Sequence, residues 1–252
     1  MIKVDNRMKK IIFFRVLMFV CGVCFLATIA SAQESPDTEI ETPATKPTVS
    51  TPGTIALAFY KLTRQAPDFE SWAQQTQAYK DASPFEQQAV QEAQVEKMKE
   101  AYNLLMLTEP LVIETQVKLS PYYPANKGFF VDSFKETTFF PVHYNGRSYA
   151  VVPLGIMDKQ WLKVDDLAVA KSIEESARSD RRLTMVLLLT PRYADASAAT
   201  TIDGETYWPI AVDVKKMMLY PLNSDTLLWQ SYDTDAKDEK DEKHQNILNL
   251  YQ

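Results

Sequence analysis

Apolar residues recur every three or four positions between Thr54 and Leu105, which is the spacing of helices with one buried face. We expect about three helices in this segment. The first starts at Thr54, and the second follows Asp68, whose side chain is placed to cap it. The third is predicted to start at Ser83, because the run Ser83-Pro84-Phe85-Glu86 combines a capping serine, a proline in the first turn and a glutamate three residues on.

The apolar pattern changes to alternation after Pro110, which is typical of strands with one face toward the core. The dipeptide Asn145-Gly146 lies between two alternating segments and predicts a hairpin in which Val142 faces Tyr149. Residues 183–189 are apolar on both faces, so they are expected to form a central strand. Further strands are expected at residues 113–119, 128–134, 207–214, 217–220 and 226–232, and a short helix at residues 165–179.

This order of elements predicts an α+β fold. It has an N-terminal helical segment of about three helices, followed by a mainly antiparallel β-sheet with one short helix inserted. A parallel, doubly wound fold is disfavoured, because only one weak helix lies between the strands. The 252 residues contain only 6 glycines, and none of them cluster, so the glycine-rich loops that bind nucleotide phosphates are absent.

Residues 1–32 have the pattern of a secretory signal peptide, with basic residues before an apolar stretch and a small-residue cleavage site. Cleavage is expected between Ala32 and Gln33, with Ala30 as the other small residue that the peptidase recognises. The protein is therefore expected to be periplasmic or secreted, with no membrane insertion after cleavage. The alternative is an uncleaved segment that anchors the chain in the inner membrane, facing the periplasm.

Removal of residues 1–32 changes the charge and the cysteine content. The remaining chain has 22 basic and 32 acidic residues, a net charge of −10, so nucleic acid is not an expected partner. Both cysteines lie in the removed segment. We expect residues 33–52, rich in proline and threonine, to be a disordered tether, residues 53–232 to form a single α+β domain, and residues 233–252 to form a charged C-terminal tail.

No motif in residues 33–252 points to a known catalytic site. The two histidines, His143 and His244, lie near no second histidine and no cysteine, and the local patterns of serine and cysteine nucleophiles are missing. We therefore expect no catalytic residue, no metal and no cofactor. A triad built on His143 remains open, as does a hydrolase of envelope polymers that uses a carboxylate pair drawn from Asp132, Glu205 and Asp213.

Three residues are the candidates for ligand binding: Arg192, Tyr207 and Trp208. Arg192 belongs to a group with Arg178, Arg181 and Arg182 around the apolar strand. These arginines can bind an anionic ligand, but pairing with nearby acidic residues is the simpler expectation. Tyr207 and Trp208, like Tyr122 and Tyr123, can stack on a sugar, although aromatic residues in strands more often lie in the core.

Several short segments resemble a family of exported bacterial proteins known as a domain of unknown function. The resemblance covers about residues 54 to 222. The matching segments are Phe59-Tyr60-Lys61-Leu62-Thr63, Pro67-Asp68-Phe69 to Trp72, Phe139-Phe140-Pro141, Tyr149-Ala150 with Pro153, Gln160-Trp161-Leu162, and Thr190-Pro191-Arg192-Tyr193. The resemblance implies a bacterial source and a single domain, and it assigns no active site. The expected function is that of a non-catalytic envelope protein that binds a protein or polymer of the envelope. The sequence leaves the oligomeric state open.

Overall fold

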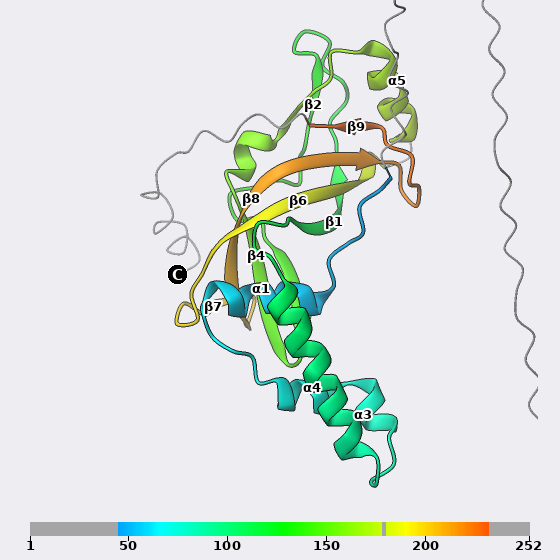
Figure 1. Cartoon of the computed structure of the whole chain (residues 1–252). Coiled ribbons are helices and arrows are strands. Elements are labelled where there is room, and N and C mark those ends of the chain that lie inside the picture. The colour runs from blue at the N-terminus through cyan, green and yellow to red at the C-terminus, as the bar shows by residue number, and fades with distance from the viewer. Residues whose placement is uncertain (1–44, 178–179, 232–252) are drawn as a thin grey trace, which may run out of the picture. The chain divides into compact units, whose positions relative to one another are not determined.

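The structure is a computed structural model that describes residues 45–177 and 180–231 (Figure 1). This part of the chain begins with four α-helices, and the strands follow them. The elements in chain order are α1 Pro52–Leu62, α2 Phe69–Gln75, α3 Gln77–Asp81, α4 Gln87–Leu104, β1 Leu111–Lys118, β2 Gly128–Phe130, β3 Phe140–Tyr144, β4 Arg147–Leu154, the 3-10 helix η1 Ile156–Lys159, β5 Trp161–Lys163, α5 Leu167–Ser176, β6 Arg182–Ala194, β7 Thr200–Ile202, β8 Glu205–Tyr220 and β9 Trp229–Gln230.

The helices before β1 differ from the predicted ones in where they begin and end. Asp68 caps α2 as predicted, since its carboxylate accepts the Ser71 N–H at 3.0 Å. This helix ends at Gln75, because Thr76 is extended and its hydroxyl caps a new helix, α3, so the segment holds four helices where about three were expected. The third helix begins three residues later than predicted, because its N-cap position is Glu86 and not Ser83. The Ser83 hydroxyl donates to the Glu86 carboxylate at 2.6 Å, so it does not cap the helix, and α4 begins at Gln87.

The chain combines these helices with a mixed sheet, which agrees with the predicted α+β class. The main sheet has the strand order β1-β6-β8-β4-β3, with β7 and β9 also paired to β8, and β2 and β5 form a separate two-stranded sheet. The Asn145-Gly146 hairpin is confirmed, with Val142 opposite Tyr149. Neighbouring strands are antiparallel except β4 and β8, which are parallel. That pairing joins segments about 50 residues apart, and no local pattern predicts it.

The longest strand, β8, covers two segments that were predicted as separate strands. The break expected between Val214 and Met217 is a bulge, where Lys215 is left out of the register with β6. A second irregularity leaves Arg192 of β6 without a partner residue, between the pairs that Pro191 and Tyr193 form. Bulges bend a strand without ending it, so β8 continues as one strand that pairs with β6 over residues 210–220 on one edge and with β4 over residues 207–213 on the other.

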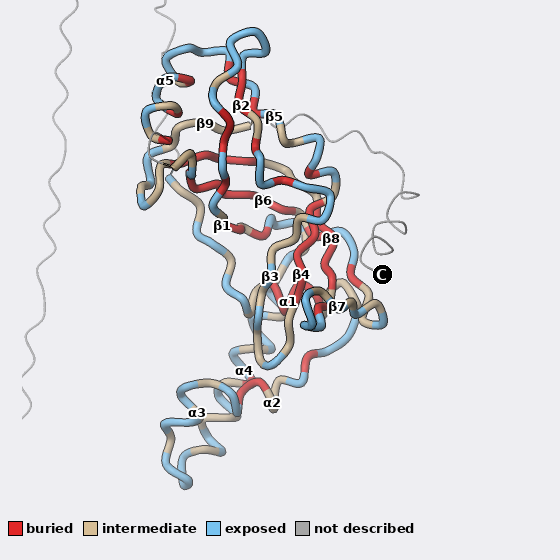
Figure 2. The backbone as a smooth tube through the Cα atoms, turned by 180° about the vertical axis from the view of Figure 1, so that it is seen from behind, coloured by how far each residue is buried: buried red, intermediate tan, exposed pale blue. Residues whose placement is uncertain are grey.

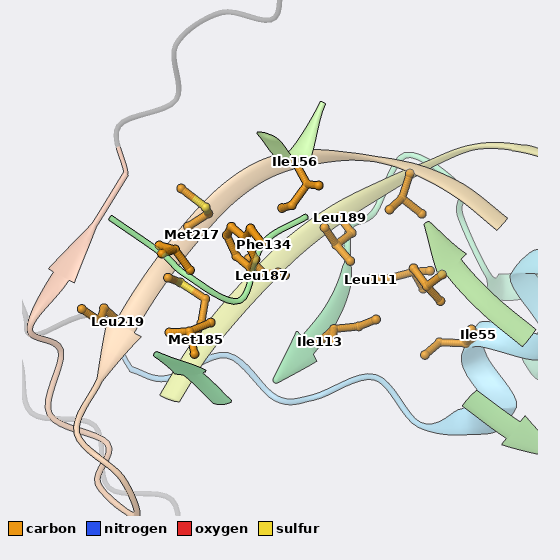
Figure 3. Close-up of a cluster of buried hydrophobic side chains, with 14 of the residues drawn as sticks. Ile55, Leu111, Ile113, Phe134, Ile156, Met185, Leu187, Leu189, Met217 and Leu219 are labelled. Carbon is orange, nitrogen blue, oxygen red and sulfur yellow. The ribbon is translucent and has the colours of Figure 1, made fainter. Parts of the chain in front are cut away.

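The core lies mainly on one face of the sheet and includes residues from α1, the strands and the loop after β2. Figure 3 shows Phe134 from that loop among Leu187 and Met217, and Ile55 of α1 beside Ile113 and Leu111. β6 lies between β1 and β8 and is buried on both faces, which confirms the prediction of a central strand for residues 183–189. In Figure 2 the buried residues gather in the strands, whereas α3 and α4 are mostly exposed or intermediate.

The first described residues already contact the sheet, although the predicted tether extends to residue 52. Lys46 forms an ion pair with Glu114 of β1 at 2.9 Å, and Ser50 is hydrogen-bonded to Val112. The predicted signal segment, the first part of the tether, the charged tail and His244 lie outside the described residues. None of the helices in the described ranges is both long enough and apolar enough to cross a membrane.

Candidate functional site

Arg192 occupies the unpaired position between Pro191 and Tyr193 on β6. Its Nε donates to the Asp213 carboxylate on the neighbouring strand β8. Arg182 likewise pairs with Asp180 at 2.6 Å, and Arg181 pairs with Glu174 at 2.5 Å, whereas Arg178 lies outside the described residues. The expectation that these arginines pair with acidic residues is therefore confirmed for the three that are described.

Tyr207 and Trp208 are consecutive on β8, so their side chains lie on opposite faces of the sheet. The Tyr207 hydroxyl donates to the Glu205 carboxylate at 2.7 Å. The Trp208 ring lies under the Arg147 guanidinium, 4.5 Å from the ring centroid. Arg192 is on β6 beside Asp213, six residues farther along β8 than Tyr207. The structure therefore does not bring the three candidate ligand-binding residues into one site.

His143, Ser148 and Glu205 meet at the surface of β3, β4 and β8. The Ser148 hydroxyl donates to Glu205 Oε1 at 2.5 Å, and His143 Nδ1 lies 2.8 Å from Ser148 Oγ and 3.1 Å from Glu205 Oε1. These are the residue types of a catalytic triad. The geometry differs from a triad, because one histidine nitrogen faces both the serine and the carboxylate instead of linking them through its two nitrogens.

The surroundings of His143, Ser148 and Glu205 also do not favour nucleophilic catalysis. The side chains of His143 and Glu205 are 60% and 46% exposed, so no dry cleft surrounds them. Hydrogen bonds from Ser148 and Tyr207 hold the pKa of Glu205 below its usual value, which makes this carboxylate a weak base. Sequence reasoning could have paired His143 with Ser148, since the Asn-Gly turn sets them opposite each other, but the parallel register that brings Glu205 close was not predictable.

An open cleft of about 580 Å³ lies between β1 and β3, the two edge strands of the main sheet. One wall is the end of β1, the other is the start of β3 with the residue before it, and the loop after β2 closes one side. The lining residues are Thr115, Gln116, Val117, Lys118, Asp132, Ser133, Phe134, Lys135, Thr137, Thr138, Phe139, Phe140 and Pro141. The volume falls within the range of known ligand-binding pockets.

The cleft combines apolar and charged side chains. Phe139 and Phe140 are partly exposed there, and Lys118 and Lys135 are exposed and form no ion pair within the described part of the chain. Asp132 is the one carboxylate among the lining residues, and no histidine or cysteine lines the cleft. This arrangement suits binding, and the lining offers no second carboxylate for acid–base chemistry.

The three carboxylates proposed for a hydrolytic pair lie in different surroundings. Asp132 lines the cleft, Glu205 is bound to Ser148 and Tyr207, and Asp213 is paired with Arg192. Glu205 and Asp213 are eight residues apart on β8, up to about 26 Å along an extended strand. The placement of these three carboxylates does not support a hydrolytic pair, which stays a prediction from the sequence.

Two aromatic residues form an exposed pair away from the core. The rings of Tyr123 and Trp161 lie 5.8 Å apart at 40°, and both are more than a third exposed. Gly128 lies directly under Trp161, where a Cβ atom would come within 2.8 Å of the indole, so the close packing requires glycine there. Tyr122, by contrast, packs against Phe129 and is not available for stacking on a ligand.

Nothing in the described ranges forms a group of three or more histidine, cysteine or acidic side chains that could hold a metal ion. Comparison with known proteins adds no assignment, since no protein-family model, no curated protein and no solved structure matches this chain. The resemblance to an exported family of unknown function therefore stays an expectation from the sequence.

Proposed function

We propose that this chain is an exported, non-catalytic binding protein of the bacterial cell envelope, and that the cleft between β1 and β3 is its binding site. The observation that carries the proposal is the cleft itself. It places two partly exposed phenylalanines and two exposed lysines around a space of about 580 Å³. Apolar walls with a few polar groups are typical of ligand sites.

Export is the second part of the proposal and is supported by residues 1–32 of the sequence. A reporter enzyme that is active only after export, fused after residue 60, should be active. The matched control is the same fusion without residues 1–32, which should be inactive. An inactive full fusion would contradict export, and equal activity of both fusions would show that residues 1–32 are not the export signal.

Site-specific cross-linking tests the cleft as the binding site. A photoreactive phenylalanine derivative in place of Lys135, on the cleft, should form an adduct with an envelope component in intact cells. The same derivative in place of Lys80, an exposed residue of α3, is the control. An adduct at Lys135 and none at Lys80 would support the proposal. No adduct at Lys135, or the same adducts at both positions, would contradict it.

A further inference from the structure

Both ends of the free edge of β1 are covered by other segments of the chain. At one end, the Ser50 N–H donates to the Val112 carbonyl and the Val112 N–H donates to Ser50 Oγ, both at 2.9 Å. At the other end, the Asp132 N–H donates to the Lys118 carbonyl at 3.0 Å. This edge therefore already accepts polypeptide backbone at two places.

Between these two places lies an uncovered window, residues 114–116. Residues in an antiparallel pair alternate between facing the neighbouring strand and facing away from it. The backbone N–H and C=O groups of Val112 and Lys118 point away from β6. The same groups of Glu114 and Gln116, at every second position between them, therefore also point away from β6. Their outward N–H and C=O groups have no hydrogen-bond partner within residues 45–177 and 180–231. The two residues are about 7 Å apart along the strand, which is the repeat of an extended peptide.

We propose that β1 binds an extended segment of another protein, three to five residues long, as an added strand paired to Glu114 and Gln116. This inference rests on the proposed function and names the class of partner. The window opens into the cleft, since Gln116 is one of its lining residues. Regularly spaced backbone donors and acceptors select a polypeptide over a sugar or a lipid, because they match the repeat of a peptide main chain.

The side chains around the window define the chemistry of the partner. The carboxylate of Glu114 in the window is paired with Lys46 at 2.9 Å. In the cleft, Lys118 and Lys135 carry two positive charges against the one carboxylate of Asp132, so an acidic residue on the incoming segment is favoured. Phe139 and Phe140 are partly exposed in the lining, so they add an apolar surface that an apolar residue can contact, although the Phe139 ring also packs against Tyr207. The partner is therefore an extended segment that carries an acidic side chain and an apolar side chain within its three to five residues.

The opposite wall of the cleft is a poorer edge for strand addition. In β3, Val142 pairs with Tyr149 and Tyr144 with Arg147 beside the turn, so Pro141 faces away from β4. Proline has no N–H to donate, which breaks the row of donors on this edge. A second copy of the chain is also disfavoured on β1, because its own covering segments would meet those at Val112 and Lys118.

Replacement of Gln116 by proline tests the pairing directly. The Gln116 N–H faces away from β6, so Gln116→Pro removes an outward donor and places a ring in the path of the added strand while the bonds to β6 remain. Gln116→Thr changes the side chain and keeps the N–H, and is the matched control. The probe is a phage-displayed library of random heptapeptides selected on the purified full-length protein, followed by affinity measurement with the selected peptides as synthetic fluorescent ligands.

We expect selected heptapeptides to bind the wild type and Gln116→Thr with affinities within about twofold of each other, and Gln116→Pro about tenfold more weakly or worse. Amide hydrogen exchange on the wild type gives a second readout that needs no variant. Binding should slow exchange at the Glu114 and Gln116 amides. Equal binding by Gln116→Pro, or unchanged exchange at both amides, would overturn the inference.

The outcomes separate this inference from the proposed function. An adduct at Lys135 that consists of a non-peptide component, with no heptapeptide selected, would leave the cleft as the binding site and overturn strand addition. Absence of both the adduct and a selected peptide would overturn both. A concentration-dependent dimer in sedimentation that Gln116→Pro abolishes would identify a second copy as the occupant and overturn the proposed partner.

Discussion

Glu174 of α5 forms hydrogen bonds with residues from two other segments of the chain, one before β2 and one before β6. Its carboxylate accepts two hydrogen bonds from the Arg181 guanidinium, at 2.5 and 3.3 Å, and one from the Tyr122 N–H at 2.7 Å. Arg181 also donates to the carbonyls of Leu119 and Ser120 at the end of β1. The sequence predicted that Arg181 pairs with an acidic residue, but it did not identify Glu174 as that residue.

Replacement of Glu174 by glutamine should lower the free energy of unfolding by about 1–2 kcal/mol at neutral pH. Charge-assisted hydrogen bonds are lost, and partial exposure of the pair limits the effect. Glu100→Gln, on the exposed face of α4, is the control and should change stability by less than about 0.5 kcal/mol. Urea unfolding of both variants measures this difference.

The contribution of Glu174 should also depend on pH. Burial alone would raise its pKa, but the bonds from Arg181 and from the Tyr122 amide outweigh burial and hold the pKa below its usual value. The stabilisation is therefore fully present above the ordinary glutamate pKa of about 4.3 and is lost as the pH falls through the lower folded value. The stability difference between the wild type and Glu174→Gln should shrink below about pH 4. A constant difference down to about pH 2 would contradict this role.

At the scale of elements, a lysine of α1 binds the C-terminal end of α4. Lys61 of α1 donates from Nζ to the carbonyls of Tyr102 at 2.9 Å, Asn103 at 3.2 Å and Leu105. These carbonyls have no intrahelical partner at the end of the helix, and a cation there also complements the helix dipole. Val95 is the one buried residue of α4, and the Tyr102 ring also packs against Phe69 of α2.

Lys61→Met should lower the free energy of unfolding by about 1–2 kcal/mol and increase amide exchange in the last two turns of α4. Lys80→Met removes a lysine from the last turn of α3 that is exposed, and serves as the control. Thermal unfolding and hydrogen exchange measure both effects. Equal behaviour of the two variants would mean that Lys61 does not hold α4.

Helices, strands and turns that form because of their own residues could be predicted from the sequence. The ends of strands that depend on pairing with distant segments could not. The hairpin at Asn145-Gly146 was predicted because a two-residue turn with positive φ at both positions favours these two residue types. β8 was predicted as two strands, because the lysines in its middle resemble a break, and only its pairing with β6 and β4 shows that the chain continues through a bulge.

At the scale of the whole molecule, residues 33–252 contain no cysteine, so no disulfide can stabilise the part of the chain that is expected to remain after cleavage. Reductant should therefore leave the melting temperature of the exported protein unchanged. A structural disulfide contributes about 2–4 kcal/mol, which would correspond to a decrease of several degrees on reduction in a domain of this size. The control is the same measurement with the oxidised form of the reagent. A decrease of more than about 5 °C would show that cysteines stabilise the mature protein.

The sequence by itself determined the kinds of local structure, the central position of residues 183–189 and the pairing of arginines with acids. These features depend on apolar periodicity, turn residues and charge, all of which are local properties. The cleft was decided only by the tertiary structure. It requires β1 and β3 to be the two edges of one sheet, and that follows from the parallel pairing of β4 with β8 across about 50 residues. Phe139, Lys118 and Lys135 carry no motif of their own, so only the strand order brings them together.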